Sequence, residues 1–327
     1  MHDPSIPIIY GIPKVHKPGI PFRPIVSGPN LPTYNIAKWL TTRLTTIDNN
    51  FQHVIKNSLE LKKELNSFVN ADSISLASFD VTEMYPSIPI HLAISSVKRL
   101  LCKCIPAYEV ELLIQLIQFV LNNNVFKFEN NYFWQKEGLA MGSPLSPILS
   151  NIVFNEIENN ILNSSEFKFI RFFRYADDCI VLYKDQEVME LLYNKLNDVH
   201  PTIKFTLEKE TNNTLQYLDL FIKRHKNKFV TSVYHKPNSG TQYIHAESFH
   251  PWCQKVGVWK FFFRRAILLT DLPQDLKEEQ SYIYNVGIKN GYNLQDLQKW
   301  NQQVLQKITT NGKSESSMNS PSYVGIP

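Results

Sequence analysis

Residues 169–183 read Phe-Ile-Arg-Phe-Phe-Arg-Tyr-Ala-Asp-Asp-Cys-Ile-Val-Leu-Tyr, and this stretch decides how the chain folds. Two runs dominated by aromatic and aliphatic residues, 167–175 and 179–183, predict two strands. Only residues 176–178 lie between them, so we expect a tight β-hairpin. Because Asp is a common turn residue, an ordinary turn is one interpretation of the two acids. A surface turn, however, needs no such length of apolar strand on both sides, which favours a functional interpretation.

A third acid closes a strand in another part of the chain. Residues 74–80 have the pattern of a buried strand that ends on Asp80. Asp80 and Asp177 are far apart in the sequence, so only the pairing of their strands in one sheet would bring them together. Buried carboxylates are unfavourable without compensation, and adjacent acids such as Asp177 and Asp178 repel one another. Divalent cations relieve both penalties, and Mg²⁺ prefers hard oxygen ligands of this kind. Two ions about 3.5–4 Å apart would hold an in-line phosphoryl transfer.

Apolar periodicity predicts the elements around these acids. Helices are expected over residues 33–47, 58–69, 89–104, 107–121, 144–161, 187–198 and, for the most part, 252–308. Further strands are expected over residues 22–27, 203–208, 215–222 and 228–235, with a small hairpin over 125–128 and 132–135. Helices on one face of an antiparallel sheet, followed by an all-helical end, make an α+β fold. The polar residues 309–327 are expected to form a linker or a disordered tail.

Composition bounds the class of protein. The 327 residues are 43% hydrophobic and have a net charge of +4, which suits one large or two ordinary domains. Because no run of about 18 apolar residues is present, a membrane span is not expected. The first residues lack the basic and apolar regions of a secretory signal. Four scattered cysteines make no disulfide framework, so we expect reduced thiols in the cytosol or nucleus.

Positive charge is concentrated in residues 223–265. This segment has nine Lys or Arg residues, four His and nine aromatic residues against one acid, Glu247. Cations interleaved with aromatic rings suit a nucleic acid, because the cations neutralise phosphates and the rings stack on bases. An ordinary solvated face with core aromatics is the alternative interpretation.

Three motifs, in matching order and spacing, resemble those of reverse transcriptases. Tyr175-Ala176-Asp177-Asp178 resembles their Tyr-x-Asp-Asp box, although Val is more usual than Ala at its second position. Residues 79–89 resemble their first carboxylate motif, and residues 135–147 resemble their Gly-x-x-x-Gly-Ser-Pro box. Residues 10–17, 23–27, 217–219, 234–237, 248–251 and 264–266 extend the resemblance to Penelope-like retroelements, which are relatives of the telomerase catalytic subunit. The resemblance covers roughly residues 8–270.

The resemblance implies a right-hand polymerase fold. The fingers would take up residues 1–72, and the palm residues 73–222, with inserted fingers helices and a hairpin at about 89–140. A primer grip and a helical thumb would follow in residues 223–308.

The resemblance also implies the roles of individual residues. Asp80 and Asp177 would bind two Mg²⁺ ions, with Mn²⁺ as an alternative metal. The carbonyl group of Val81 would add an oxygen ligand, and Asp178 would support the site or coordinate more weakly. Tyr85 would lie under the incoming sugar and exclude a 2′-hydroxyl, the alternative being a core tyrosine.

Other residues would bind the nucleotide and the template–primer. By resemblance, Lys14, Arg23, Gly142 and Ser143 would contact the nucleoside triphosphate, although both cations suit an ordinary surface as well. Contacts with the template–primer are expected from Gly138, Pro144, Tyr217, Leu218, Asp219, Lys255, Lys260 and Arg264. Taken by itself, Ser143-Pro144 also predicts the N-cap and first residue of the helix over 144–161.

These motifs lead to the hypothesis of an RNA-directed DNA polymerase of a retroelement. Its expected partners are an RNA template, a DNA primer and dNTPs, and its expected localisation is the nucleus. An inactive RNA-binding scaffold and an intron maturase are the alternatives. The intact acids, Tyr85 and Arg23 speak against the scaffold, and the lack of a basic extension after the thumb speaks against the maturase. The family's N-terminal region and its GIY-YIG nuclease are not found, so we expect a fragment or a truncated copy.

Overall fold

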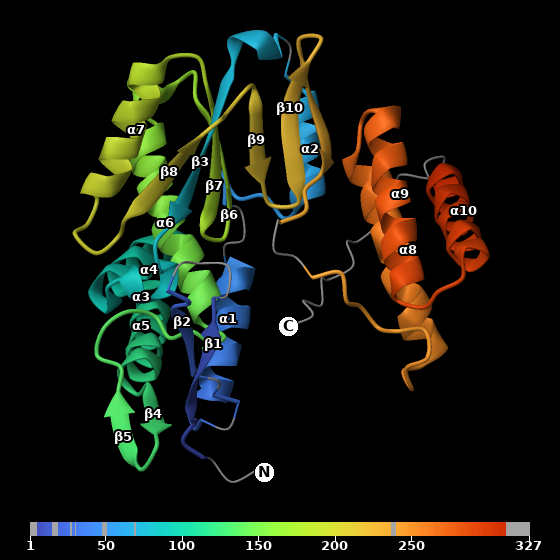
Figure 1. Ribbon diagram of the computed structural model, residues 1–327. Coiled ribbons are helices and arrows are strands. Elements are labelled where there is room, and N and C mark those ends of the chain that lie inside the picture. Colours follow the sequence, from blue (N-terminus) through green and yellow to red (C-terminus); the bar gives the residue numbers. More distant parts are fainter. Residues whose placement is uncertain are drawn as a thin grey trace. The chain divides into compact units, whose positions relative to one another are not determined.

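The computed structural model describes residues 5–14, 19–26, 28–29, 31–47, 51–68, 70–236 and 240–311. It confirms a mixture of helices and antiparallel sheets (Figure 1). The chain divides into two compact units. Unit 1 comprises Met1–Asn57 and Asn70–Leu215, and unit 2 comprises Ser58–Val69 and Gln216–Pro327.

Unit 1 is built on an antiparallel sheet of four strands in the order β6-β7-β3-β8. Their bounds are Ser75–Val81 (β3), Arg171–Tyr175 (β6), Asp178–Tyr183 (β7) and Phe205–Lys209 (β8). The predicted hairpin of β6 and β7 is confirmed, and β3, from far earlier in the chain, is the central neighbour of β7. Strand pairing therefore does bring the two acidic segments into one sheet.

Alternate residues of this sheet enter one hydrophobic core with the helices of unit 1. Phe79 of β3 and Val181 of β7 lie in that core, because side chains of a strand alternate between its faces. Leu149 and Phe154 of the helix over residues 146–162 lie in the same core. The helices are Tyr34–Ile47 (α1), Met84–Ser87 (α3), Ile90–Cys104 (α4), Ala107–Asn122 (α5), Ser146–Leu162 (α6) and Gln186–Asp198 (α7), with 3-10 turns at Ala71–Ser73 and Ser165–Phe167.

The start of α6 differs from the prediction. Its first residue is Ser146, followed by Pro147, so the Ser-Pro pair that opens the helix is not Ser143-Pro144. Ser143 Oγ instead accepts a hydrogen bond from the Leu145 backbone N–H (3.3 Å), in the turn that precedes the helix. The prediction placed the helix start one Ser-Pro pair too early, because both pairs carry the same local signal.

Two small antiparallel ribbons complete unit 1. The first pairs Ile9–Pro13 (β1) with Phe22–Val26 (β2), and the second pairs Val125–Phe128 (β4) with Asn131–Trp134 (β5). The ribbons adjoin, since the Lys127 N–H donates to the Pro7 carbonyl (2.8 Å).

Among its described residues, unit 2 has a three-stranded sheet in the order β11-β10-β9, in which β10 and β11 pair antiparallel, and four helices. The predicted strand over 215–222 is in fact two strands, because Leu218 takes a left-handed backbone conformation (φ 51°) that breaks it. The strands are Thr214–Tyr217 (β9), Leu220–His225 (β10) and Lys228–Val233 (β11). The helices are Ser58–Asn66 (α2), Trp252–Leu269 (α8), Pro273–Lys289 (α9) and Leu294–Asn311 (α10).

The helical end of unit 2 has its own aromatic core. Trp259 and Phe263 of α8 pack there with Ile283 of α9 and Leu297 and Trp300 of α10. Helix α2 packs against β11 and α8 of the same unit, although it lies within the predicted fingers. The division into fingers, palm and thumb stays a prediction, since compact units and functional subdomains need not coincide.

Two findings complete the description of the chain. Among the described residues, no helix is both long enough and apolar enough to cross a membrane. The expected linker falls mostly on residues 312–327, which lie outside the described part of the chain.

Candidate active site

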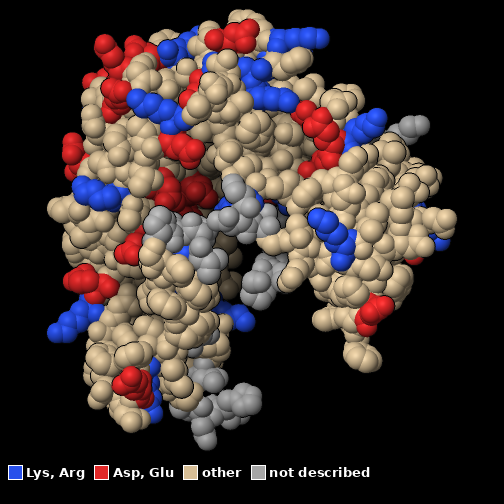
Figure 2. Space-filling model, viewed as in Figure 1, with Lys and Arg blue, Asp and Glu red and all other residues tan. Residues whose placement is uncertain are grey.

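Three acidic residues lie at one end of the unit 1 sheet. Asp80, near the end of β3, lies directly opposite Asp178, the first residue of β7. The Val81 N–H donates to the carbonyl oxygen of Asp177 (3.0 Å), so Asp177 adjoins the end of β3 as well. Opposite residues of antiparallel strands have Cβ atoms about 4.5–5.5 Å apart. The predicted convergence is confirmed, and Figure 2 shows acidic side chains gathered where Figure 1 draws the lower ends of β6 and β7.

The turn that carries Asp177 and Asp178 has an unfavourable backbone conformation and accepts a hydrogen bond from Arg174. Ala176 adopts a left-handed backbone conformation (φ 53°), which is unfavourable for a residue with a Cβ atom. The Nη1 atom of Arg174 donates a hydrogen bond to the Ala176 carbonyl oxygen (3.2 Å). Arg174 is fully buried and forms an ion pair with Glu158 of α6, whose exposed fraction is 2%.

Tyr85 stands beside these acids. It belongs to the one-turn helix α3, directly after β3, and is half-buried. Burial raises the pKa of the Tyr85 hydroxyl, and the negative charge of Asp177 raises that pKa further. The hydroxyl therefore stays neutral at physiological pH, and the ring lies within electrostatic reach of Asp177.

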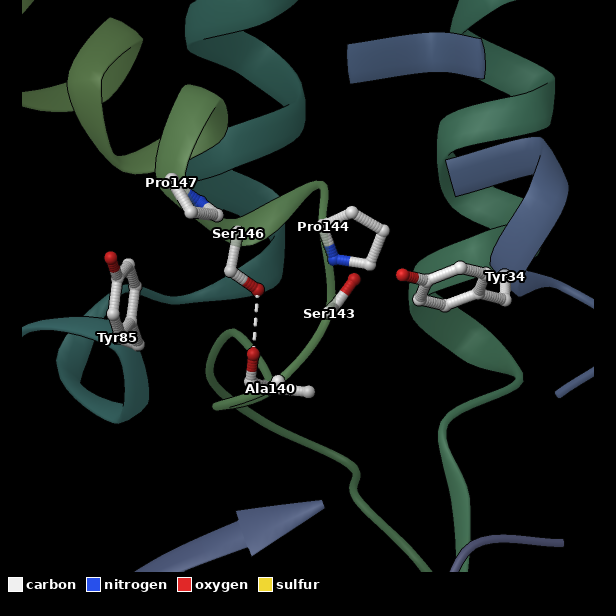
Figure 3. A pocket seen from close by; sticks show the side chains of 8 residues that line it. Tyr34, Tyr85, Ala140, Ser143, Pro144, Ser146 and Pro147 are labelled. Atoms are coloured by element: carbon white, nitrogen blue, oxygen red, sulfur yellow. Dashed lines mark hydrogen bonds between the residues drawn. The ribbon is translucent and has the colours of Figure 1, made fainter. Parts of the chain in front are cut away.

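A pocket of about 270 Å³ opens next to Tyr85. Figure 3 shows Tyr85 and Tyr34 on opposite sides, with Ser143 and Pro144 between them. Ser146 Oγ donates to the Ala140 carbonyl oxygen (2.7 Å), which fixes the loop that enters α6. The full lining is Tyr34, Tyr85, Ala140, Gly142, Ser143, Pro144, Ser146 and Pro147.

Gly138 keeps this loop against Tyr85. Its φ is +78°, and a Cβ atom there would lie 2.5 Å from the Pro86 carbonyl oxygen. The next residue, Leu139, donates its N–H to the Tyr85 carbonyl oxygen (2.8 Å). Gly138 is buried, and the Pro86 backbone lies where a side chain at this position would have to fit, while the predicted contact of Gly138 with the template–primer stays a prediction.

The cations predicted to bind triphosphate lie on or next to the β1–β2 ribbon. Arg23 is exposed and pairs across the ribbon with Ile12, and the Lys14 N–H donates to the Pro21 carbonyl oxygen (2.8 Å). Neither side chain lines the pocket. The ribbon is nevertheless tied to the pocket loop, since the Val26 N–H donates to the Met141 carbonyl oxygen (2.9 Å).

Comparisons with known proteins agree with this arrangement. The sequence pattern of the family described as "Reverse transcriptase (RNA-dependent DNA polymerase)" matches residues 15–248, well over half of the chain. The chain belongs to this reverse transcriptase family. A second pattern, "Animal helix-turn-helix domain", matches residues 242–303 in unit 2. Among curated proteins, none matches the sequence.

Solved structures show that the chain has the right-hand polymerase fold. The telomerase of Candida albicans, in complex with a fragment of telomeric RNA, superposes with a TM-score of 0.62 at 12% identity over 93% of this chain. An RNA-dependent RNA polymerase of a Sicinivirus gives a TM-score of 0.56 at 12% identity, covering 93% of this chain and 69% of the viral one. The chain described here spans only 55% of the Candida albicans chain.

The acidic residues at this sheet end are ligands of the kind that Mg²⁺ prefers. Asp80, Asp177 and Asp178 offer only hard oxygen donors, and the backbone carbonyl of Val81 would add another. Among the described residues, no group of three or more His, Cys, Asp or Glu side chains is already arranged to hold a metal ion. The donor chemistry therefore fits the ion, while the side chains are not drawn into a closed set.

The predicted primer-grip residues belong to unit 2. Tyr217 is buried, and Leu218 makes the left-handed break between β9 and β10. The Asp219 carbonyl oxygen accepts from the Tyr234 N–H (2.8 Å), and its carboxylate forms an ion pair with Arg265 (3.4 Å).

The three predicted cations of α8 differ in exposure. Lys255 is 7% exposed and donates to the carbonyl oxygens of Ala246 (2.7 Å) and Ser248 (2.5 Å). This burial argues against its predicted contact with template and primer. Lys260 is half-buried and Arg264 is exposed, so both keep surface for a partner.

Sequence reasoning missed Arg174, Glu158 and Tyr34. A charged residue in a strand is usually solvent-exposed, and the residue type alone does not distinguish Arg174 from Arg171, which is indeed exposed. The available signal was the alternation of β6, which places Arg174 on the same face as the buried Phe172.

Proposed function

We propose that this chain is the RNA-directed DNA polymerase of a Penelope-like retroelement. It transfers nucleotides from dNTPs to a primer 3′-hydroxyl along an RNA template. The observation that carries the proposal is the pairing of Asp80 with Asp178, with Asp177 beside them, next to a pocket bounded by Tyr85. Membership of the reverse transcriptase family supports it.

In the proposed reaction, the primer 3′-oxygen bonds to the α-phosphorus of the dNTP as the bond to pyrophosphate breaks. Asp80, Asp177, Asp178 and the Val81 carbonyl would hold two Mg²⁺ ions. When bound, such ions stabilise the attacking and leaving oxygens of an in-line displacement. The contribution of the protein is to hold these carboxylates at one sheet end, so that positioning and electrostatics supply most of the rate enhancement.

The pocket supports recognition of the nucleotide. Its volume of about 270 Å³ suits a sugar and part of a base better than a whole triphosphate. Tyr85 would form its wall under the sugar, where a neutral ring disfavours a 2′-hydroxyl by contact. Arg23 and Lys14 would reach the triphosphate, the guanidinium by paired hydrogen bonds and the ammonium as a point charge.

Unit 2 supports a role in binding the template–primer. Lys260 and Arg264 of α8 keep surface for phosphate contacts, and the match to a helix-turn-helix pattern falls on the same helices. Duplexes of A-like form are recognised by shape and backbone rather than by sequence. Because a retroelement copies into a genome, the proposed place of action is the nucleus.

Primer extension on an RNA template tests the proposal. Wild type with Mg²⁺ and dNTPs is expected to extend the primer, whereas Asp177→Asn is expected to lose at least about 100-fold in rate. Asp198→Asn, at the exposed end of α7, is the matched control and should extend at the wild-type rate. Thermal unfolding of all three proteins verifies that they are folded.

Three outcomes would contradict the proposal. Equal extension by wild type and Asp177→Asn would remove the catalytic assignment. Incorporation of rNTPs in preference to dNTPs would favour an RNA polymerase, as in the viral structure of similar fold. Binding of RNA by a folded wild type that extends no primer with Mg²⁺ or Mn²⁺ would favour the scaffold.

A further inference from the structure

A buried ion pair lies directly beneath the acidic turn. We propose that Arg174 is a positioning residue, paired with Glu158, that holds the turn carrying Asp177 and Asp178 in the geometry that metal binding requires. The inference rests on the proposed function, because it concerns the same carboxylates.

The side chain of Arg174 links strand β6 to helix α6 and to the acidic turn. Its Nε atom forms the ion pair with Glu158 of α6, and its Nη1 atom donates to Asn151 Oδ1 (2.9 Å), also on α6. The same Nη1 atom donates to the Ala176 carbonyl oxygen (3.2 Å). The guanidinium therefore links the core helix to the middle of the acidic turn.

The backbone of Arg174 is fixed as well. Its N–H donates to the His53 carbonyl oxygen (2.7 Å), and its own carbonyl accepts from the Ile55 N–H (2.9 Å). The guanidinium carbon lies 5.5 Å from the centre of the Phe154 ring. With both its main chain and its side chain held, Arg174 has little freedom to move away from the turn.

Stability alone does not account for this pair. Replacing a buried ion pair with apolar residues is commonly neutral or stabilising, because desolvation of the charges offsets their attraction. Among the described residues, Glu158 Oε2 and Arg174 Nη2 are buried without a hydrogen-bond partner, so the pair is only partly satisfied. Burial raises the pKa of Glu158 although the charge of Arg174 opposes the rise.

The turn, by contrast, needs what the pair supplies. Ala176 holds a left-handed conformation that is unfavourable for a residue with a Cβ atom, and the adjacent carboxylates repel one another. The hydrogen bond from Arg174 to the Ala176 carbonyl holds the left-handed conformation, and the positive charge of the guanidinium offsets the repulsion between the carboxylates.

The test is a double variant, Arg174→Met with Glu158→Leu, which removes both charges together. It should unfold at the wild-type temperature or above. Its kcat for primer extension should fall about 10–100-fold, the Mg²⁺ concentration for half-maximal rate should rise about tenfold, and affinity for template–primer should not change. In metal-free protein, the backbone amides of residues 176–178 should exchange with deuterium faster than in wild type.

Two further variants make the result decisive. Arg174→Lys keeps the charge without the guanidinium fork, and is expected to restore part of the kcat and of the protection of the turn. If the double variant does not fold, faster exchange of residues 176–178 in Arg174→Lys supports the proposal, and wild-type exchange overturns it. The matched control is Arg99→Gln with Glu156→Gln, a partly exposed pair that also involves α6 and should leave kcat and exchange unchanged.

The outcomes separate this inference from the proposed function. Wild-type kcat, Mg²⁺ dependence and exchange in a folded double variant would overturn the positioning role, while Asp177→Asn in the same assay stays inactive. Full activity of Asp177→Asn would overturn the proposed function itself.

Discussion

The two units bury different cations. Among the described residues of unit 1, Arg174 is fully buried and pairs with Glu158, which is buried as deeply. In unit 2, the buried cations of the described residues are Lys62 and Lys255. Lys62 donates to the Leu268 carbonyl oxygen (2.9 Å) and pairs with Asp271 (2.8 Å), whose side chain is 22% exposed. Among the described residues, Lys255 donates to the backbone carbonyl oxygens of Ala246 and Ser248.

This difference separates two uses of a buried charge. A lysine on a flexible stem reaches backbone carbonyls and keeps some hydration, so it ties chain segments together without a buried partner charge. An arginine bridges several acceptors in fixed geometry and, when fully buried, needs a counter-charge. Lys62 and Lys255 have structural tasks in unit 2, while Arg174 connects the core to the acidic turn. The predictions that follow test this contrast.

The largest expected effect on stability comes from breaking the Arg174 pair. Glu158→Leu alone leaves an uncompensated guanidinium in the core of unit 1 and should lower the free energy of unfolding by about 3–5 kcal/mol. Urea unfolding followed by circular dichroism measures it. Since the double variant with Arg174→Met should recover that loss, a single variant as stable as wild type would mean that the buried charges are not coupled.

A smaller loss is expected at Lys62. Lys62→Met removes the donor of the Leu268 carbonyl, but Asp271 keeps its bonds from the Thr231 N–H (2.7 Å) and hydroxyl (3.0 Å) and stays partly hydrated. We expect a loss of about 2–3 kcal/mol in the free energy of unfolding, measured in the same urea experiment. A loss as large as that of Glu158→Leu would erase the contrast between the units.

Lys255 separates structure from nucleic-acid binding. Lys255→Met should lower the free energy of unfolding by about 1–2 kcal/mol, since two carbonyls lose a donor near the surface, and leave the affinity for an RNA–DNA duplex unchanged. Arg264→Ala, on the exposed face of α8, should weaken that affinity and reduce its salt dependence. Fluorescence anisotropy at several salt concentrations measures both. Equal weakening by the two variants would restore the direct role that the sequence suggested for Lys255.

The sequence predicted the sheet end but not the support beneath it. The strands that carry Asp80, Asp177 and Asp178 follow from local patterns, namely apolar runs that end or begin at acids, and their expected pairing is what the sheet shows. The Arg174–Glu158 pair depends on how α6 packs on β6, a long-range fact that neither segment shows by itself.

Long-range packing also decided the other differences. In the sequence, Lys255 does not differ from the other cations of the same helix. In the structure, its ammonium group donates to backbone carbonyl groups of residues 246–248. Helix α2 lies within the predicted fingers in sequence, yet it buries Leu61 and Leu65 within unit 2. Strand β9 ends where Leu218 turns left-handed, a conformation that the apolar pattern of 215–222 does not reveal.

The smallest effect distinguishes two glutamates of the same helix. Glu156 pairs with Arg99, whose Nη2–Oε2 distance is 3.0 Å, at a site where the two side chains are 27% and 52% exposed. Partial burial acts to raise the pKa of Glu156, but hydrogen bonds from Arg99 and Ser96 and the charges of Arg99 and Lys103 outweigh it and lower the pKa. The pair should contribute less than about 1 kcal/mol, and less again at high salt.

The two glutamates should therefore give opposite pH dependence. For Glu156, a folded pKa below the unfolded value of about 4.3 means that its contribution is complete above that pH and is lost as the pH falls through the folded pKa. For Glu158, whose pKa is raised, the carboxylate costs stability as the pH rises from the unfolded pKa through the folded one. Urea midpoints across this pH range should show the gap between wild type and Glu156→Gln closing toward low pH. The double variant Arg174→Met with Glu158→Leu should instead gain on wild type as the pH rises, and parallel curves for the two comparisons would show that burial does not set their pKa values apart.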